Sequence, residues 1–460
     1  MKYEELRETY PKFFYHGFDV EEKEENISIV YDFEIEGLSS FNPTWTIPLP
    51  ENAKGITETK LFKDCAFNLG MIELISYWKI SCPPETIVEC GTLDETQKTW
   101  WKKLYFHGLG EFFYTNGIET SLDDFMNLRS VGKEQEGTEY PFLHQNKGCL
   151  VPVGGGKDSF VSLHVLEGMK EECRAFVINA VPSAIHASIA AGYEGENLIN
   201  PKRTLDKRML ELNKQGYLNG HTPFSAMAAF ASYLCAVVTG RKYICLSNEA
   251  SANESTVKDS DVNHQYSKTF DFEKDFYDYS HTYLNPDILY FSLLRPLSEL
   301  QIAAVFSTLK KYHPVFRSCN VGQKEEKWCG HCAKCLFVCI MLSAYLSDEE
   351  LIAIFGRDML NDPEMMELFE QLTGILDNKP FECVGTRDEV NTAVCMSIRN
   401  HEKNGKELPL LYQNYKDSAE YYSFYRDKSV DLNAWNSENL LPEEFETLLR
   451  RKMGELHVNE

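Results

Sequence analysis

The stretch Val153-Gly154-Gly155-Gly156-Lys157-Asp158-Ser159 decides the expected fold. It stands between a short apolar segment, residues 149–153, and a helix-periodic segment, residues 158–169. Three consecutive glycines let the backbone turn tightly and bring its N–H groups close to a ligand, and the start of a helix adds a partial positive charge. The stretch therefore predicts a phosphate-binding loop between a strand and a helix, with a glycine-rich surface turn as the alternative.

Two common phosphate motifs are excluded by position. A Walker loop would need glycine where Val151 stands and Ser or Thr where Asp158 stands. The dinucleotide fingerprint would need its third glycine at Ser159. The stretch instead resembles the SGGxDS loop of the PP-loop ATP-pyrophosphatases, with Gly154 in place of the usual serine.

That resemblance covers residues 148–310 and implies the parallel sheet of the adenine nucleotide alpha-hydrolases. It also implies ATP as co-substrate, with Mg²⁺ neutralising the leaving diphosphate. Lys157 is expected to contact phosphate, and Asp158 either caps the following helix or orients the metal, of which capping is preferred. The residues expected to bind the nucleotide are Gly154, Gly155, Gly156, Lys157, Asp158 and Ser159.

The neighbouring segments support an α/β core. Residues 149–153, 175–181 and 243–247 are predicted strands, and residues 158–169 and 224–238 are predicted helices. Strands and helices in alternation indicate a parallel sheet, whose ligands bind at the carboxyl ends of the strands. The segment Leu294-Arg295-Pro296-Leu297 resembles the "PL" segment that follows such cores, although the frequent lysine is here Gln301.

The rest of the chain suggests additional domains, as its length of 460 residues also does. Residues 27–33 are a predicted strand, residues 58–78 a predicted helix and residues 132–137 a predicted linker. Residues 348–355, 363–372 and 438–453 are predicted helices. We expect an N-terminal α+β domain at 1–146, an ATP-pyrophosphatase domain at 147–311, a four-cysteine insert at 312–346 and a mainly helical region at 347–460.

Composition limits the partners. A formal net charge of −24 repels polyanions, so a nucleic-acid substrate is not expected. The apolar stretch 223–240 is too short and too often interrupted by Ser and Thr to cross a membrane, and is expected to be a buried helix. The first 14 residues have no apolar run, and 14 cysteines without an export signal indicate reduced thiols or metal ligation. The expected location is the cytoplasm; the oligomeric state is left open.

Four cysteines form a candidate metal site. Cys319, Cys329, Cys332 and Cys335 suit a tetrahedral thiolate site, for which Zn²⁺ is the natural occupant. Four thiolates leave no open coordination position, so the zinc would be structural. The alternative is a set of reduced thiols. The arrangement also resembles the cysteine cluster of 7-cyano-7-deazaguanine synthase, which supplies an alternative function.

Polar loops follow the third core strand and are expected to face the substrate. Together with Trp328-Cys329-Gly330-His331-Cys332 and Gly108-Leu109-Gly110-Glu111-Phe112, they resemble the UDP-N-acetyl-α-D-muramoyl-L-alanyl-L-glutamate epimerase (MurL) family over most of the chain. The alternative for these loops is a solvated surface. The predicted substrate contacts are Ser247, Asn248, Asn253, Asn263, Gln265 and Arg295.

The resemblance implies an ATP-dependent epimerase of peptidoglycan biosynthesis, which inverts the terminal L-glutamate of a nucleotide-linked precursor and releases AMP and diphosphate. The candidates for the general base are His264, Lys268, Glu249 and Glu254, in that order. A basic cluster, Lys202, Arg203, Lys207 and Arg208, either receives the anionic substrate or is a solvated helix face. The competing hypotheses are an amide- or nitrile-forming PP-loop enzyme and a non-catalytic nucleotide-binding protein.

Overall fold

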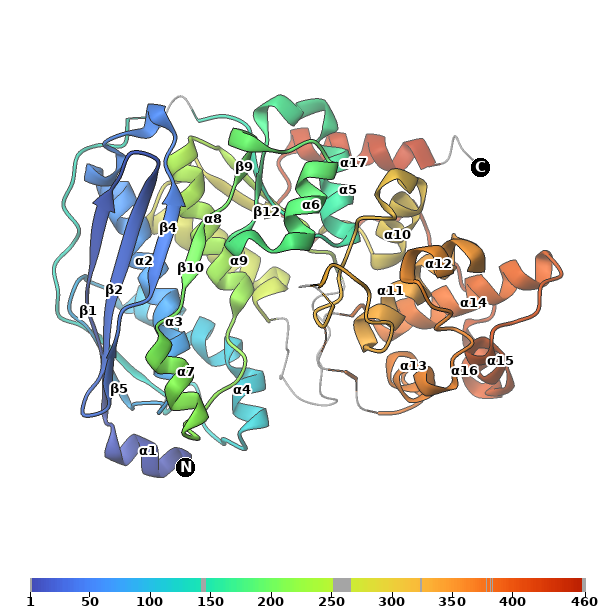
Figure 1. The fold of residues 1–460 in the computed structure, drawn as a ribbon, viewed down its shortest axis with the longest axis horizontal. Coiled ribbons are helices and arrows are strands. Elements are labelled where there is room, and N and C mark those ends of the chain that lie inside the picture. Colours follow the sequence, from blue (N-terminus) through green and yellow to red (C-terminus); the bar gives the residue numbers. More distant parts are fainter. Residues whose placement is uncertain are drawn as a thin grey trace.

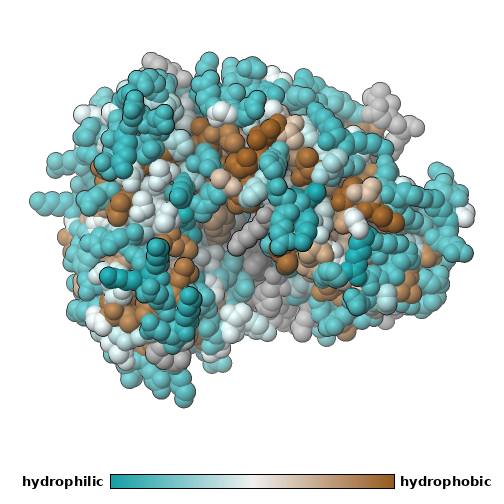
Figure 2. Space-filling model, in the orientation of Figure 1, coloured by the Kyte–Doolittle hydropathy of each residue, from teal (hydrophilic) through white to brown (hydrophobic). Residues whose placement is uncertain are grey.

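A computed structural model describes residues 2–141, 146–250, 266–322, 325–377, 379–380, 382 and 384–456. Two sheets form the body of the molecule, one built mainly from the N-terminal third and one from the middle of the chain, and helices of the C-terminal third lie beyond the second sheet (Figure 1). The face drawn in Figure 2 is predominantly hydrophilic, in keeping with the acidic composition.

The first sheet is mixed and has seven strands, in the order β10-β4-β2-β1-β5-β6, with β3 paired to β2. In β2, buried and less buried residues alternate because successive side chains point to opposite faces, and this confirms the strand predicted at 27–33. The strands are β1 Lys12–Glu22, β2 Asn26–Ile35, β3 Ser39–Phe41, β4 Thr44–Pro48, β5 Glu85–Val88, β6 Asn127–Ser130 and β10 Lys202–Thr204.

One long helix, α2 (Lys60–Trp78), lies behind this sheet and is buried on almost all sides. The side chain of Thr59 caps it by accepting a hydrogen bond from the N–H of Phe62, so the helix predicted at 58–78 is confirmed with a start at Lys60. α2 packs against α8 (Phe224–Thr239), the buried helix expected at 223–240. The other helices of this half are α1 Tyr3–Thr9, α3 Glu95–Gly108 and α4 Gly110–Thr115.

The second sheet has five strands in the order β12-β11-β7-β8-β9, and every neighbouring pair is parallel. Chain order runs outward from β7 in both directions, which is the doubly wound arrangement, and the order reverses between β7 and β11. The strands are β7 Cys149–Pro152, β8 Arg174–Phe176, β9 Leu198–Ile199, β11 Tyr243–Leu246 and β12 Leu289–Ser292. The predicted parallel sheet is therefore confirmed.

The strand predicted at 175–181 is too long, because β8 ends at Phe176 and residues Ile178–Ala180 form a 3₁₀ turn. Asn179 and Ala180 have positive φ angles, 62° and 46°. Such backbone is costly for residues other than glycine and persists only where its surroundings fix it. Here the Oδ1 atom of Asn179 accepts a 2.7 Å hydrogen bond from the N–H of Arg203.

Helices cover the parallel sheet on both faces and continue into the C-terminal third (Figure 1). The prediction at 348–355 matches α12; the one at 363–372 is a 3₁₀ turn followed by α13, and the one at 438–453 begins later, at Glu443. The helices are α5 Lys157–Val165, α6 Pro182–Ala190, α7 Lys207–Lys214, α9 Phe270–Tyr283, α10 Glu299–Thr308, α11 Ala333–Ser343, α12 Asp348–Phe355, α13 Met366–Thr373, α14 Arg387–Lys403, α15 Leu410–Asp417, α16 Ala419–Tyr425 and α17 Glu443–Leu456.

The chain crosses between the two halves. β10 leaves the parallel core and pairs with β4 at the edge of the N-terminal sheet, and α17 returns from the far end to pack on α5 and α10. Among the described residues, no helix combines the length and apolar character that crossing a membrane requires.

Candidate functional site

The glycine loop, residues 154–159, runs from the end of β7 into the first turn of α5, at the point where the strand order reverses. Gly155 has a φ angle of +85°, which glycine adopts without strain. The N–H of Gly154 donates to the Ser159 Oγ atom at 3.0 Å and closes the turn. Gly156 is the N-cap of α5 and provides no side-chain cap, so N–H groups of the first helical turn are left for a ligand. The predicted loop between strand and helix is confirmed.

The preferred role for Asp158, capping the helix, is wrong. Asp158 is the second residue of α5 and its carboxylate makes no cap. Its Oδ1 atom instead lies 2.5 Å from the Lys157 ammonium. Asp158 also lines the cavity described below, which leaves metal orientation as the remaining alternative.

The Lys157 side chain is buried between two carboxylates and does not line a cavity with the loop, which corrects the expected phosphate contact. Its side chain is 2% exposed and forms ion pairs with Asp158 and with Glu299, the first residue of α10. Burial alone would lower the pKa of Lys157, but the two carboxylates outweigh it and the pKa is raised. Burial raises the pKa of Glu299 to about 8. Lys157 therefore holds the loop onto α10.

A cavity of about 380 Å³ opens beside the glycine loop at the carboxyl ends of β7, β8 and β11. Its apolar lining includes residues from the end of β8, from the segment that follows it and from α8, among them Phe176, Val177, Ile178, Val181, Phe224 and Ala228. Its charged lining consists of Asp158, Glu249, Lys268 and Lys334. An apolar surface next to backbone N–H groups and charges suits a phosphorylated ligand with a flat apolar part.

Four predicted site residues beyond the loop meet at this cavity: Ser247, Asn248, Glu249 and Lys268. Ser247 is held by a 2.8 Å hydrogen bond between its Oγ atom and that of Ser162, and the Asn248 amide donates to Ser292 Oγ at 3.2 Å. The remaining candidates on the loop that follows β11, namely Asn253, Glu254, Asn263, His264 and Gln265, lie outside the described residues.

Arg295 does not reach the cavity, which corrects its predicted contact with substrate. It is fully buried, and its guanidinium pairs with the Glu273 carboxylate at 2.7 Å. It also donates to the carbonyl oxygens of Glu249 and Lys268, at 2.6 and 2.7 Å. Arg295 thus fixes the backbone of two cavity residues instead of contacting a ligand.

The basic cluster expected at 202–208 is not one surface. Arg203, on β10, turns into the N-terminal half, where its guanidinium pairs with the buried carboxylate of Glu73 at 2.7 Å. Arg208 donates to the carbonyl oxygen of Ser40. The hypothesis of an anion-binding patch therefore fails at Arg203.

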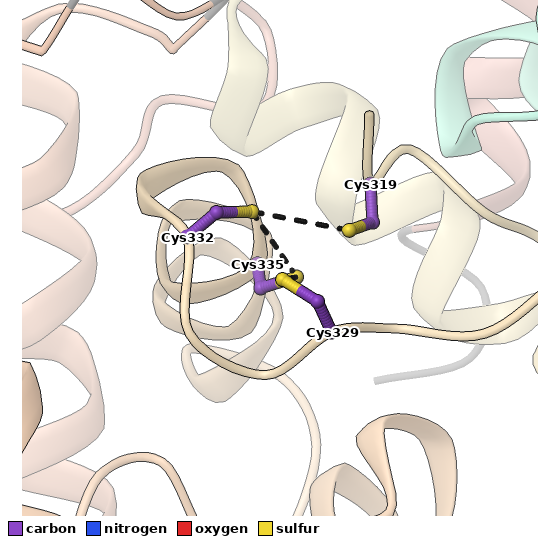
Figure 3. A group of neighbouring side chains, drawn as sticks. All are labelled: Cys319, Cys329, Cys332 and Cys335. Carbon is purple, nitrogen blue, oxygen red and sulfur yellow. Dashed lines mark hydrogen bonds between the residues drawn. The ribbon is translucent and has the colours of Figure 1, made fainter. Parts of the chain in front are cut away.

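The four predicted cysteine ligands come together (Figure 3). Their Sγ atoms all lie within 4.8 Å of one another, and three pairs are 3.4, 3.7 and 3.9 Å apart. A tetrahedral zinc site with Zn–S bonds of about 2.3 Å places its sulfur atoms about 3.8 Å apart. The hydrogen bond between Cys332 and Cys335 lowers the pKa of the Cys332 thiol and raises that of Cys335. The donor set and spacing fit Zn²⁺.

The structure adds cavity residues that sequence reasoning missed: Ser318, Asn320 and Lys334. Ser318 and Asn320 flank the first cysteine, and Lys334 stands between the third and the fourth. The sequence predicts the cluster only as a separate structural unit. Its resemblance to the cluster of another nucleotide-using enzyme was the one signal that could have suggested contact with the glycine loop.

The strand order, the glycine loop at the switch point and the adjoining cavity define a doubly wound α/β protein with a candidate ligand site at the carboxyl edge of its parallel sheet. The chain belongs to the MurL family. Residues 4–293 match the MurL N-terminal domain and residues 315–422 match the MurL C-terminal domain.

Three relatives carry the name UDP-N-acetyl-alpha-D-muramoyl-L-alanyl-L-glutamate epimerase. The protein of Xanthomonas oryzae pv. oryzae is 33% identical over 79% of this chain and 78% of its own length. The proteins of Salinispora tropica and a Micromonospora species are 29% and 28% identical, each over 82% of this chain and over 82% and 83% of their own lengths. No solved structure matches the chain.

Proposed function

We propose that the protein is an ATP-dependent isomerase that inverts the terminal L-glutamate of UDP-N-acetylmuramoyl-L-alanyl-L-glutamate during peptidoglycan biosynthesis. The names of the relatives provide the substrate and the epimerisation. One observation carries the ATP-dependent part: the glycine loop opens onto a cavity that has an apolar part and a charged part. AMP and diphosphate are the proposed nucleotide products.

The parallel core is proposed to be of the PP-loop ATP-pyrophosphatase type. The doubly wound strand order and the position of the loop at the switch point support this assignment. The adenine ring would lie against the apolar lining near Ile178 and Phe224, and the outer phosphates would meet the N–H groups of the loop.

Mg²⁺ would be held by Asp158, a carboxylate that lines the cavity, together with the phosphates, and would neutralise phosphate charge. Burial raises the pKa of Asp158, but the ammonium groups of Lys157 and Lys334 more than offset this and lower the pKa overall. Asp158 is therefore ionised at neutral pH. Oxygen donors of this kind fit a hard divalent cation.

The chemistry follows from charge. A proton next to a carboxylate is hard to remove because the resulting carbanion stands beside an existing negative charge. Attack of the glutamate carboxylate oxygen on the α-phosphorus forms an acyl-adenylate and releases diphosphate. The acyl carbonyl then accepts carbanion charge, so a base can remove the α-proton and a proton can return from the opposite face. Hydrolysis of the acyl-adenylate releases AMP and the D-epimer.

Two of the four candidate bases, Glu249 and Lys268, line the cavity. Arg295 holds the carbonyl oxygens of both residues, so their backbone positions are coupled. We propose that the proton is removed by one of this pair or by His264 or Glu254 of the loop between them. A cytoplasmic location is proposed as well, since the described cysteines are free thiols and the substrate is a nucleotide-linked precursor.

The decisive experiment incubates the protein with ATP, Mg²⁺ and UDP-N-acetylmuramoyl-L-alanyl-L-glutamate, measures AMP and diphosphate, and determines the chirality of glutamate after acid hydrolysis. We expect D-glutamate to accumulate together with AMP. Asp158→Asn should lower AMP formation by about 100-fold, whereas Asp123→Asn, at an exposed position outside the cavity, should not. Product that retains L-glutamate would refute the proposal. AMP formed only with carboxy-deazaguanine and ammonia would favour the alternative function.

A further inference from the structure

The cysteine cluster and the glycine loop are joined directly. The N–H of Arg317 donates to the carbonyl oxygen of Gly155 at 2.7 Å. A Cβ atom at Gly156 would lie 2.7 Å from the Ser318 Oγ atom, so the two segments are in close contact at this point. Cys319, the first ligand of the cluster, follows immediately. The segment that enters the cluster thus forms part of the wall around the loop.

The cluster also fixes the start of α11. Cys332 is the N-cap of this helix, Lys334 is its second residue and Cys335 its third. The Sγ atom of Cys332 lies 3.9 Å from that of Cys319 and 3.4 Å from that of Cys335. A metal ion bound by these thiolates would tie the segment beside the glycine loop to the helix that carries Lys334.

Because Lys157 does not line the cavity, the contact with the outer phosphates needs another positively charged side chain. Lys157 is committed to Asp158 and Glu299. Among the described residues, Lys268 and Lys334 are the lysines that line the cavity. Lys334 is half-buried, and its ammonium lies 5.3 Å from the centre of the Phe337 ring. It lines the same cavity as Gly154, Gly156 and Asp158 of the glycine loop.

We propose that Lys334 binds the β- and γ-phosphates of the nucleotide, and that the metal-bound cysteine cluster is the scaffold that positions it. This inference rests on the proposed function only in taking ATP as the ligand of the cavity. A lysine between two metal ligands on a helix start has a fixed backbone, so less freedom is lost when its ammonium meets phosphate. Lys334 thus takes the phosphate contact that the sequence suggested for Lys157.

Nucleotide binding tests the lysine. Dissociation constants for ATP and AMP with Mg²⁺ should be measured by calorimetry for the wild type, Lys334→Ala, Lys334→Arg and the control Lys327→Ala. Lys327 belongs to the same segment but is 64% exposed, pairs with Glu325 and does not line the cavity. We expect Lys334→Ala to weaken ATP binding by about 10- to 100-fold, the loss typical of a charged hydrogen bond.

AMP lacks the outer phosphates, so its affinity should change by less than about twofold in the same variant. Lys334→Arg should keep most of the affinity for ATP, and Lys327→Ala all of it. Equal losses for ATP and AMP, or no loss, would overturn the role of Lys334. A wild type that binds ATP in this manner but makes no D-glutamate would refute the proposed function and leave this inference standing. A wild type that binds no ATP would overturn both.

Metal analysis tests the scaffold. Reduced protein should contain about one zinc ion per chain. Cys332→Ser, or treatment with a strong chelator, should remove the zinc and weaken ATP binding to the level of Lys334→Ala, while Cys90→Ser, at a half-buried thiol outside the cluster, should change neither. Zinc should restore ATP binding after chelation. Full ATP affinity in metal-free protein, with unchanged circular dichroism, would overturn the scaffold role.

Discussion

Each half of the molecule contains a buried group of paired charges, and the two groups differ in how their charges are balanced. In the N-terminal half, Glu73 on α2 meets the Arg203 guanidinium through both oxygens, and Trp45 Nε1 donates a further hydrogen bond to it. One cation matches one anion. Next to the glycine loop, the single ammonium of Lys157 contacts two carboxyl groups, those of Asp158 and Glu299. The Asp158 side chain is 26% exposed at the cavity.

The difference separates a structural pair from a functional one. In the Glu73–Arg203 pair the two charges cancel, and the Arg203 guanidinium donates hydrogen bonds to Glu73 and to Ser76 within the protein. In the group formed by Lys157, Asp158 and Glu299 (the Lys157 group), the Asp158 carboxylate lines the cavity, where a cation arriving with the nucleotide would meet it. Lys157 therefore connects α5 to α10 and presents Asp158 to the ligand at the same time.

The largest expected effect is on the free energy of unfolding, when the acidic partner of Arg203 or of Lys157 is removed. Glu73→Ala leaves the Arg203 guanidinium buried without its partner, which should lower the free energy of unfolding by ~3–5 kcal/mol. Glu299→Ala should lower it by less, ~1–3 kcal/mol, because Asp158 still pairs with Lys157. Urea unfolding followed by tryptophan fluorescence measures both.

ATP affinity completes that comparison. Only Glu299→Ala should weaken ATP binding, because only this pair supports a cavity residue; Glu51→Ala, at a side chain 84% exposed, is the control for both measurements. If Glu73→Ala weakened ATP binding in protein that is still folded, the two sheets would not be functionally separate.

A second test compares two neighbouring glycines of the loop. Gly155 has φ +85°, and a Cβ atom there would lie 3.0 Å from the backbone of Ser183. Gly155→Ala should therefore move the N–H groups of the loop and lower AMP formation by about 100-fold, as the loss of preorganised donors does. Gly154 has nothing within 4 Å of its Cβ position. Gly154→Ser should thus change the rate by about twofold or less. Equal effects would argue against a preorganised loop.

Local pattern was enough to predict the glycine loop, the main strands of the parallel core and the meeting of the four cysteines. Glycines, apolar periodicity and cysteine spacing act over short distances along the chain. The direction of the Lys157 side chain was not predictable in this way, because its partner Glu299 is 142 residues further along the chain.

The same limit applies to Arg203 and Arg295. The sequence suggests a ligand contact for both, yet the buried partners that neutralise them, Glu73 and Glu273, come from other elements. Nothing in the 202–208 segment shows that β10 joins the N-terminal sheet. Each of these two arginines forms a buried ion pair with a carboxylate that is distant in the sequence, and not the predicted ligand contact.

The smallest predicted effect is the pH dependence of stability that comes from Glu299, the partner of Lys157. Burial raises the pKa of Glu299 from 4.5 to about 8, so the folded state keeps a proton that the unfolded state releases between those values. The free energy of unfolding should consequently fall as pH rises from about 4.5 to about 8. Lys157 acts outside this window, because its raised pKa removes stability only above 10.5.

Glu299→Gln cannot release a proton and should make the stability less dependent on pH in that window. The measurement is urea unfolding of the wild type and of the variant at about pH 5.5 and about pH 8.5. His16, whose pKa is also raised, destabilises both proteins equally as pH rises above 6.5, so it cancels in the difference. If the variant kept the full pH dependence of the wild type, Glu299 would be ionised throughout this window, and Lys157, Asp158 and Glu299 together would carry one excess negative charge.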